Sequence, residues 1–398
     1  MEGIESRLSG AGELLDLIRS HGPLTRAEIV ERTGLARSTV NGRLDTLLGT
    51  ALIRPAGASA STGGRRPTTF AFDTTAGVLL VADLGASGMR VAVCDLAGSI
   101  QDEREAKHDI ADGPQPVLDQ VTNLFTELLH DADRTAADVR GIGISVPGPV
   151  EFATGRVVSP PIMTGWDGYD IPGYFAAEYD CRVVVDNDVN AMAYGAHRAE
   201  YPDTAHLLMI KVGTGVGSGV VADGKVLRGA QGAAGDIGHT RAEIADDTPP
   251  ECHCGNVGCV EAYVGGWAVA RDLRAEGYQT AAVDDVVALV QAGDPTATRL
   301  IRRGGRILGA SVASAVSLLN PSVVVFAGQL AAAEQHLLAG VRELVYQRSL
   351  PLATRSLEIA ASRLDLQAGA VGLSYLLADT IFAPDQLATL VRRTEPTT

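Results

Sequence analysis

The sequence lacks several features that would assign it to a special class of protein. No apolar run approaches the roughly 20 residues that cross a bilayer, and Glu2 and Glu5 stand where a secretory signal carries basic residues. Only five residues are cysteine, and Cys94 and Cys181 lie far apart in predicted strands, so no disulfide framework is expected. These absences predict a cytoplasmic protein that binds no membrane.

The chain also lacks the positive charge of a general nucleic-acid binder, since its formal net charge is −15. The charge is nevertheless uneven. Residues 1–70 contain nine Arg and seven Asp or Glu, so they carry +2 and the remainder carries −17. With 398 residues, 46% of them apolar, and 45 glycines, the chain is typical of a globular α/β protein of two or three domains.

A segment rich in histidine, cysteine and glycine is the most specific feature of the acidic part. Thiolate and imidazole are the usual ligands of tetrahedral zinc, and Gly255 and Gly258 allow the tight turns that such a segment needs. The predicted ligands of a structural zinc ion are His239, Cys252, Cys254 and Cys259. Four protein ligands leave no position for a catalytic water, so the metal would organise the site. The alternative is a chance cluster of buried thiols.

Residues 1–72 predict a small helical head with a β-hairpin. Apolar residues recur at helical spacing in 11–19, Thr25 and Glu28 form a capping box for a second helix, and Gly34 lies in a turn before a third helix at 36–49. Strands at 51–54 and 68–72 would form a wing. This spacing resembles a winged helix-turn-helix domain.

The third helix and the wing carry side chains suited to DNA. Short polar side chains and arginine near a helix N-terminus reach base edges and phosphates, and paired arginines suit phosphates or a narrow minor groove. The predicted DNA-contacting residues are Arg37, Ser38, Thr39, Asn41, Arg43, Arg65 and Arg66. In the alternative, the head contacts only protein and its arginines form a solvated surface.

The body contains two units in which a strand, a glycine turn and a second strand follow one another, at 78–95 and 206–221. Glycine lets the backbone approach a ligand closely, so two such turns facing a cleft could bind phosphates. Their repetition indicates duplicated lobes.

Between these units, strands at 141–149 and 183–191 end in polar or glycine turns, where open α/β sheets usually place binding groups. Asp186, Asn187 and Asp188 together are more polar than a helix start requires, which favours a ligand-facing role. Alternatively, Asp188 is only an N-cap.

These residues resemble the ROK family, and the resemblance covers nearly the whole chain. The specific motifs are the junction at 63–67 and the His/Cys signature at 238–259. The resemblance implies an α/β body with the sugar-kinase fold and its actin-like duplicated lobes, preceded by the winged head of the family's sugar-responsive transcriptional regulators. The expected domains are 1–72, a first lobe at 76–195 to which a helix near 372–391 returns, and a second lobe at 196–371 with the zinc site.

The resemblance also implies a sugar site. Sugar hydroxyls would be held by Asn187, Asp188, Asp236, His239 and Glu261, with Gly148 nearby. Carboxylates and amides make directional hydrogen bonds to a polyol, and His239 would bind zinc by one ring nitrogen and sugar by the other. In family kinases the acid equivalent to Asp188 is the general base for phosphoryl transfer from ATP.

Several positions depart from the kinase pattern. Asp236 replaces a usual Glu, which retracts the carboxylate by roughly 1.5 Å. The first phosphate turn reads Asp83-Leu84-Gly85-Ala86-Ser87, side chains at Ala327 and Gln329 would crowd a nucleotide, and Pro160-Pro161 lies where kinases often carry Asn or Thr. Because phosphoryl transfer depends on positioning, catalysis is not expected.

The sequence therefore predicts a sugar-responsive DNA-binding regulator, a repressor of carbohydrate metabolism genes, acting as a homodimer or homotetramer on a palindromic operator. Coupling is expected to run through the zinc segment and a long helix after Glu261. One alternative is an ATP-dependent sugar kinase carrying a DNA-binding head, supported by the intact Asn187–Asp188 pair. Another is a regulator that has lost sugar binding, supported by Asp236 and Pro160-Pro161.

Overall fold

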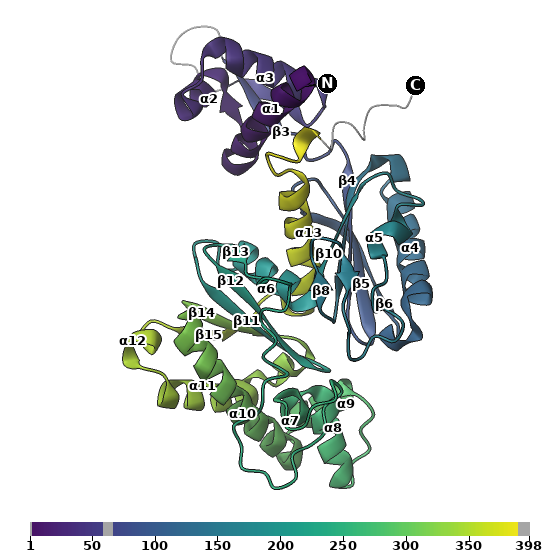
Figure 1. Cartoon of the computed structure of the whole chain (residues 1–398), viewed down its shortest axis with the longest axis vertical. Helices are drawn as coiled ribbons and strands as arrows, with labels where there is room; N and C mark the ends of the chain where they lie inside the picture. The colour runs from purple at the N-terminus through teal and green to yellow at the C-terminus, as the bar shows by residue number, and fades with distance from the viewer. Residues whose placement is uncertain (1, 59–66, 389–398) are drawn as a thin grey trace.

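The computed structural model describes residues 2–58 and 67–388. The chain forms an elongated molecule with a small helical head at one end and two sheet-containing lobes below it (Figure 1). Arg65, Arg66 and the end of the predicted C-terminal helix lie outside the described residues.

The head consists of three helices and a three-stranded sheet of order β1-β3-β2. Its elements are α1 (Glu2–His21), β1 (Leu24–Thr25), α2 (Arg26–Thr33), α3 (Arg37–Gly49), β2 (Ile53–Ala58) and β3 (Thr68–Phe72). The capping box is confirmed: Thr25 Oγ1 accepts from Glu28 N at 3.3 Å, and Thr25 N donates to Glu28 Oε2 at 2.7 Å. Gly34 ends α2 at a φ of 67°, a left-handed conformation that glycine adopts freely.

The first lobe is built on a five-stranded sheet of order β10-β7-β4-β5-β6, in which β10, β7 and β4 are parallel and β5 and β6 are antiparallel. The strands are β4 (Val78–Leu84), β5 (Gly88–Cys94), β6 (Ile100–Lys107), β7 (Val139–Val146) and β10 (Arg182–Asn187). Helix α4 (Pro114–Asp131) covers one face and α13 (Ala368–Ile381) the other. Alternate residues of β4 enter these two cores, Leu80 facing α4 and Leu79 facing α13.

The second lobe repeats this arrangement. Its sheet has the order β13-β12-β11-β14-β15, with β11, β14 and β15 parallel and β12 and β13 antiparallel. The strands are β11 (Leu207–Val212), β12 (Val216–Ala222), β13 (Lys225–Val226), β14 (Val323–Ala327) and β15 (Glu358–Ala361). Helices α10 (Pro295–Leu319) and α11 (Glu334–Arg348) cover one face and α6 (Asp188–Ala199) the other. The shared strand arrangement confirms the predicted duplication.

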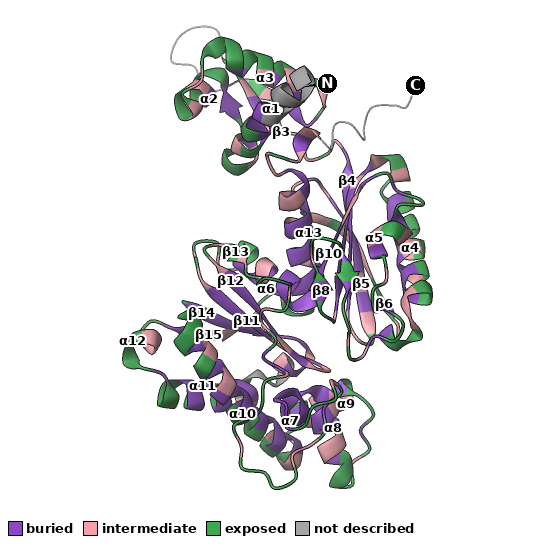
Figure 2. Ribbon diagram, viewed as in Figure 1, coloured by how far each residue is buried: buried purple, intermediate pink, exposed green. Residues whose placement is uncertain are grey.

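Helices α6 and α13 form the joint between the two sheets. A Cβ at Gly372 would lie 1.7 Å from the Ala191 carbonyl oxygen, and one at Gly195 would lie 2.5 Å from that of Ala368. Only glycine permits this close crossing. Figure 2 shows that α13 and the central strands of both sheets are largely buried, whereas α4 and α11 turn exposed faces outward.

The predicted long helix after Glu261 is wrong. The chain instead forms α7 (Glu261–Val264) and α8 (Gly266–Ala275), separated by Gly265 in an extended conformation. A Cβ at Gly265 would lie 2.9 Å from the Glu261 carbonyl oxygen and 3.0 Å from that of Thr214. Close approach to the second glycine turn therefore breaks the helix.

The remaining short helices and strands lie outside the two five-stranded sheets. They are β8 (Val150–Glu151), β9 (Arg156–Val157), α5 (Ile171–Phe175), α9 (Val283–Gln291) and α12 (Pro351–Thr354). Within residues 2–58 and 67–388, no helix combines the length and apolar character needed to cross a bilayer.

Candidate functional site

The four predicted metal ligands lie together. Cys252 Sγ lies 3.6 Å from His239 Nδ1, Cys254 Sγ lies 3.7 Å from Cys259 Sγ, and all four ligand atoms lie within 4.8 Å of one another. Zinc–sulfur bonds of about 2.3 Å and zinc–nitrogen bonds of about 2.0–2.1 Å would place tetrahedral ligand atoms about 3.5–3.8 Å apart. The donor set therefore fits a tetrahedral metal ion.

Local chemistry supports a metal at this cluster. Gly255 and Gly258 adopt φ values of 88° and 75°, which allows the tight turns between the thiols. Burial raises the pKa of the Cys259 thiol to about 12 in the protein alone, so a cation is needed to hold it as a thiolate at neutral pH. His253 lies outside the ligand set and stacks on Trp267 with ring centroids 4.1 Å apart.

The chain segment after the cluster supports the second glycine turn. Glu261 is 8% exposed, and its Oε2 accepts a hydrogen bond from Val216 N at 2.9 Å. Its Oε1 accepts from Trp267 Nε1 at 3.4 Å and lies 3.9 Å from Cys252 Sγ. Backbone N–H groups of Gly266 and Trp267 donate to the carbonyls of Gly213 and Thr214. The cluster of His239 and the three cysteines is thus linked through Glu261 to the turn between β11 and β12.

Asn187 provides the N-cap that the sequence also allowed for Asp188. Its Oδ1 accepts from Val189 N at 3.0 Å and Asn190 N at 3.4 Å, while its Nδ2 donates to the Gly148 carbonyl at 3.0 Å. Asp188 is the first residue of α6, 4% exposed, and its Oδ2 forms an ion pair with Lys211 of β11. Asp188 therefore faces the second lobe as well as the start of its own helix.

The third polar residue of this stretch, Asp186, is an anchor between the lobes. Its Oδ2 accepts from Arg228 Nε at 2.9 Å and Nη2 at 2.6 Å, and its Oδ1 accepts from Asn190 Nδ2 at 3.0 Å. The Arg228 guanidinium also lies 3.7 Å from the centre of the Phe152 ring. Because Asp186 is 1% exposed, a bidentate cation is the partner its burial requires.

Lys211 and Arg228 are site residues that the sequence prediction missed. The available signal was a lysine in the otherwise apolar run 207–212. Burial lowers the pKa of Lys211, but the Asp188 and Asp83 carboxylates together raise it by more, so the net shift is upward.

Asp83, near the end of β4, accepts a hydrogen bond from Ser145 Oγ at 2.5 Å. Burial raises the pKa of Asp83 to about 6, and the Asp188 charge adds to this effect.

The predicted sugar residues approach the start of β12 from two sides. Val189, next to Asp188, lies against Gly217, where a Cβ would come within 2.9 Å of it, and Glu261 holds the neighbouring Val216. Gly148 is buried beneath Met163 and Pro160. Asp236 is exposed and makes no hydrogen bond or ion pair to any other described residue.

On the head, the predicted DNA-contacting side chains of α3 fall into two groups. Arg37, Ser38, Thr39 and Asn41 are exposed. Arg43 is partly buried against Gly10 of α1, and its Nη1 lies 3.0 Å from Glu13 Oε2. The four exposed residues are free to meet a partner, whereas Arg43 also docks α3 on α1.

Asp379 of α13 joins the head to the body. Its Oδ1 lies 3.0 Å from Arg19 Nη2 of α1, and its Oδ2 accepts from Tyr194 OH of α6 at 2.6 Å. Arg198 of α6 pairs with the same oxygen. Beside this cluster, Phe72 of β3 packs edge-on against Phe382 with ring centroids 5.2 Å apart. The head therefore contacts α13, and the same Asp379 carboxylate joins α13 to α6.

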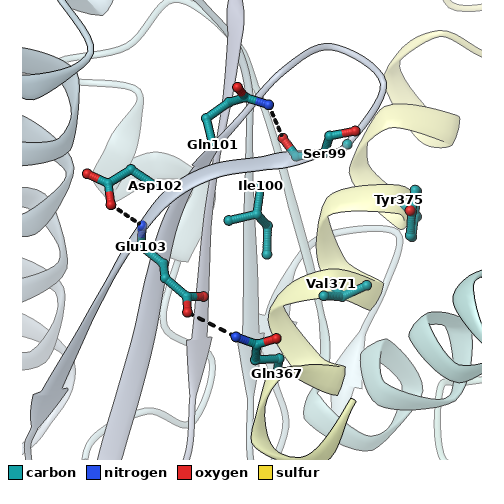
Figure 3. Close-up of a pocket in the computed structure, with 9 residues that line it drawn as sticks. Ser99, Ile100, Gln101, Asp102, Glu103, Gln367, Val371 and Tyr375 are labelled. Atoms are coloured by element: carbon teal, nitrogen blue, oxygen red, sulfur yellow. Dashed lines mark hydrogen bonds between the residues drawn. The ribbon is translucent and has the colours of Figure 1, made fainter. Parts of the chain in front are cut away.

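A depression of about 420 Å³ lies between β6 and α13 (Figure 3). Its lining residues are Gly98, Ser99, Ile100, Gln101, Asp102, Glu103, Gln367, Val371 and Tyr375. None of the predicted sugar, metal or DNA residues lines it, so it is separate from the candidate site.

Comparison with known proteins assigns the family. Residues 79–380 match the ROK family, and residues 10–55 match the IclR helix-turn-helix domain. The chain belongs to the ROK family. This ROK protein is 28% identical over 387 residues to a putative xylose repressor of Caldicellulosiruptor sp. (strain Rt8B.4), with 94% of this chain and 96% of the relative covered. It is 26% identical over 360 residues to the DNA-binding transcriptional dual regulator NagC of Escherichia coli (strain K12), with 88% and 87% covered.

Solved structures give the same assignment. A ROK family transcriptional regulator, homologous to the E. coli MLC protein, superposes with a TM-score of 0.81 at 25% identity, covering 97% of this chain and 99% of that one. A ROK hexokinase from Thermus thermophilus gives 0.62 at 26% identity and covers 76% of this chain and 99% of that one. These matches confirm the predicted family, the sugar-kinase-like fold and the helix-turn-helix head.

Proposed function

We propose that this ROK protein is a sugar-responsive, DNA-binding transcriptional repressor whose body binds a sugar without phosphorylating it. One observation carries the proposal: the head is attached through Asp379 to α6, the helix that begins at the predicted sugar-binding pair Asn187–Asp188. Relatives named as a xylose repressor and an N-acetylglucosamine repressor support it, because they align over both head and body.

The proposed sugar ligands are Asn187, Asp188, Asp236, His239 and Glu261, with Gly148 beside them. Carboxylate and amide groups suit a neutral polyol, and each charged hydrogen bond contributes about 1.5–3 kcal/mol. D-Xylose and N-acetylglucosamine are the first candidates, since relatives carry these sugars in their names.

The proposed metal is a structural zinc ion held by His239, Cys252, Cys254 and Cys259. It would fix the loop that carries Glu261 and would leave His239 Nε2 available to a sugar hydroxyl. The contact of Glu261 with the second glycine turn supports this bracing role.

The proposed signal runs along α6. The helix rises about 1.5 Å per residue, so Asp188 and Arg198 lie about 15 Å apart along its axis. A sugar that binds Asn187–Asp188 more tightly in one lobe arrangement favours that arrangement, and the rigid helix carries the change to Asp379 and Arg19. Two heads in a homodimer or homotetramer would then meet the half-sites of a palindromic operator differently, through α3 and the wing arginines.

An operator-binding experiment tests the function. The purified chain should select a palindromic sequence from a random DNA pool, and one sugar of a xylose, N-acetylglucosamine and glucose panel should change its operator Kd by about 5–150-fold. Asp188→Asn should abolish the sugar response while retaining operator binding. Absence of sequence-specific binding, or a full sugar response in Asp188→Asn, contradicts the proposal.

A second experiment tests the α6 route. Asp379→Asn should retain sugar-induced thermal stabilisation and operator binding but reduce the effect of sugar on operator Kd. Asp385→Asn, an acid of the same C-terminal region with no ion pair to another described residue, is the matched control. Unchanged coupling in Asp379→Asn contradicts the route.

A sugar kinase carrying a DNA-binding head is the second candidate, because the Asp188 carboxylate is present at the start of α6. A coupled assay for ADP release across the same sugars separates the two. Turnover that Asp188→Ala abolishes would establish the kinase and replace the repressor proposal.

A further inference from the structure

Two carboxylates of the first lobe lie at the same edge of its sheet: Asp83 of β4 is aligned with Ser145 of β7, which is aligned in turn with Asp186, two residues before Asp188. Asp83 is the last residue but one of β4 and is partly buried, and Asp188 begins α6, with a side chain only 5% exposed. The Asp188 charge raises the pKa of Asp83, and both carboxylates raise the pKa of Lys211. Paired carboxylates of this kind usually require a cation, which in a phosphoryl-transfer site is a magnesium ion shared with nucleotide phosphates.

Here the cation belongs to the protein. Lys211 extends from β11 of the second lobe, its Nζ pairs with Asp188 Oδ2, and its side chain is 22% exposed. Lys211 is one of three lysines in the chain, and the other two, Lys107 and Lys225, lie on β6 and β13. The ammonium group therefore balances the charge of Asp188 without an external metal ion.

A second side chain covers the adjoining turn. A Cβ at Gly213 would lie 2.4 Å from Gln329 Oε1 and 3.8 Å from Lys211 Cε. Glycine turns bind phosphates through an open backbone surface, but this surface of Gly213 is covered by a carboxamide from the segment that follows β14. Gln329 and Lys211 thus lie against the same glycine from two different elements.

We infer that Lys211 and Gln329 occupy the place of the magnesium ion and nucleotide phosphates, so that the cleft admits a neutral sugar and excludes magnesium–nucleotide complexes. The inference rests on the proposed function for the statement that the cleft binds sugar. The inference goes beyond that function by naming Lys211 and Gln329 as the residues that exclude nucleotides. Removal of the lysine should leave Asp83 and Asp188 as an unfilled carboxylate pair that attracts a divalent cation.

Manganese, detected by its electron paramagnetic resonance signal, serves as the probe for magnesium. In zinc-loaded full-length protein, Lys211→Met should bind one Mn²⁺ at least tenfold more tightly than the wild-type chain. The gain should disappear in Lys211→Met/Asp83→Asn. Lys225→Met, which removes an exposed lysine from the same sheet, should bind Mn²⁺ like the wild type.

A fluorescent ADP analogue tests the second residue. With Mn²⁺ present, Lys211→Met/Gln329→Gly should bind the nucleotide at least tenfold more tightly than Lys211→Met alone. Thermal melting checks that each variant is folded, and Lys211→Gln replaces Lys211→Met if the latter is not.

Three results overturn the inference: equal Mn²⁺ affinity in wild type and Lys211→Met, a gain that survives Asp83→Asn, or no nucleotide gain from Gln329→Gly. Neither probe involves sugar or operator DNA. The inference can therefore fail while sugar still changes operator binding, and the proposed function can fail while the Mn²⁺ gain is observed.

Discussion

At the scale of single residues, the stretch Asp186-Asn187-Asp188 shows how three adjacent polar side chains acquire three different tasks. Asn187 caps α6, Asp186 anchors Arg228, and Asp188 pairs with Lys211. The sequence indicated that these residues matter, because their polarity exceeds what a helix start needs. It could not assign the tasks, since the two cations lie 23 and 42 positions away along the chain.

Asp83 provides a pH prediction at this scale. Burial raises its pKa from near 4 to about 6, so between these pH values the folded chain binds the proton more tightly than the unfolded chain. The contribution of this residue to the free energy of unfolding therefore falls as pH rises from 4 to 6. Asp83→Asn should gain on the order of 2–3 kcal/mol of stability relative to wild type over that interval.

Urea unfolding of both proteins at pH 4.5 and 7 measures this difference. The control is Asp203→Asn, which alters an exposed acid with no hydrogen bond or ion pair to another described residue and should show no such trend. A stability difference between Asp83→Asn and wild type that does not change with pH would refute the assignment.

At the scale of elements, local patterns predicted what depends on neighbouring residues. The capping box at Thr25, the wing strand at 68–72 and both strand–turn–strand units are present. The helix predicted after Glu261 failed because its break at Gly265 arises from a contact with Thr214, more than 50 positions away. Helical periodicity cannot contain that information.

The crossing of α6 and α13 gives a matched pair of glycine substitutions. Gly372→Ala would place a Cβ 1.7 Å from the Ala191 carbonyl oxygen, so the helices must separate, at a cost of about 1–3 kcal/mol or more. Gly42→Ala lies in α3 with no heavy atom within 4 Å of its Cβ and should stabilise the chain by about 0.5–1 kcal/mol. Guanidinium unfolding measures the change in stability caused by each substitution. Equal changes for the two variants would contradict the close contact between α6 and α13.

The metal segment gives a third prediction. Cys254→Ser removes one ligand, so zinc affinity should fall by more than about 100-fold, beyond the effect usual for residues that only support a ligand. Metal analysis of purified protein and titration with a chelator measure this change. Cys94→Ser, far from the cluster in β5, should retain one zinc ion per chain. The Cys254→Ser variant is expected to fold and to bind operator DNA without responding to sugar. A normal response to sugar would show that the metal does not take part in signalling.

At the scale of the whole molecule, the head, α13 and α6 form one continuous connection. Apolar residues of α1 and α3 share a cluster with Leu376, Leu377 and Phe382, and Asp379 adds the polar contacts beside it. These packed contacts support the proposed signal route from the lobes to the head.

The wing is the basis for the prediction at this scale. Arg65→Ala/Arg66→Ala should weaken operator binding and reduce the slope of log affinity against log salt by about 1.8, since each lost phosphate contact contributes about 0.9. Arg299→Ala, a 58% exposed residue of α10, is the control. An unchanged slope would show that the pair does not contact phosphate.

The sequence by itself determined the class of each part: the head's helices and hairpin, the duplicated strand units and the four histidine and cysteine side chains that come together. These depend on periodicity, turn residues and ligand spacing, which are local properties. Tertiary structure alone decided that Lys211 and Arg228 neutralise the buried acids, that Gln329 covers Gly213, and that Asp379 joins the head to α6. Those contacts depend on bringing distant segments together, because a buried charge acquires its partner only when the two lobes pack around the same joint.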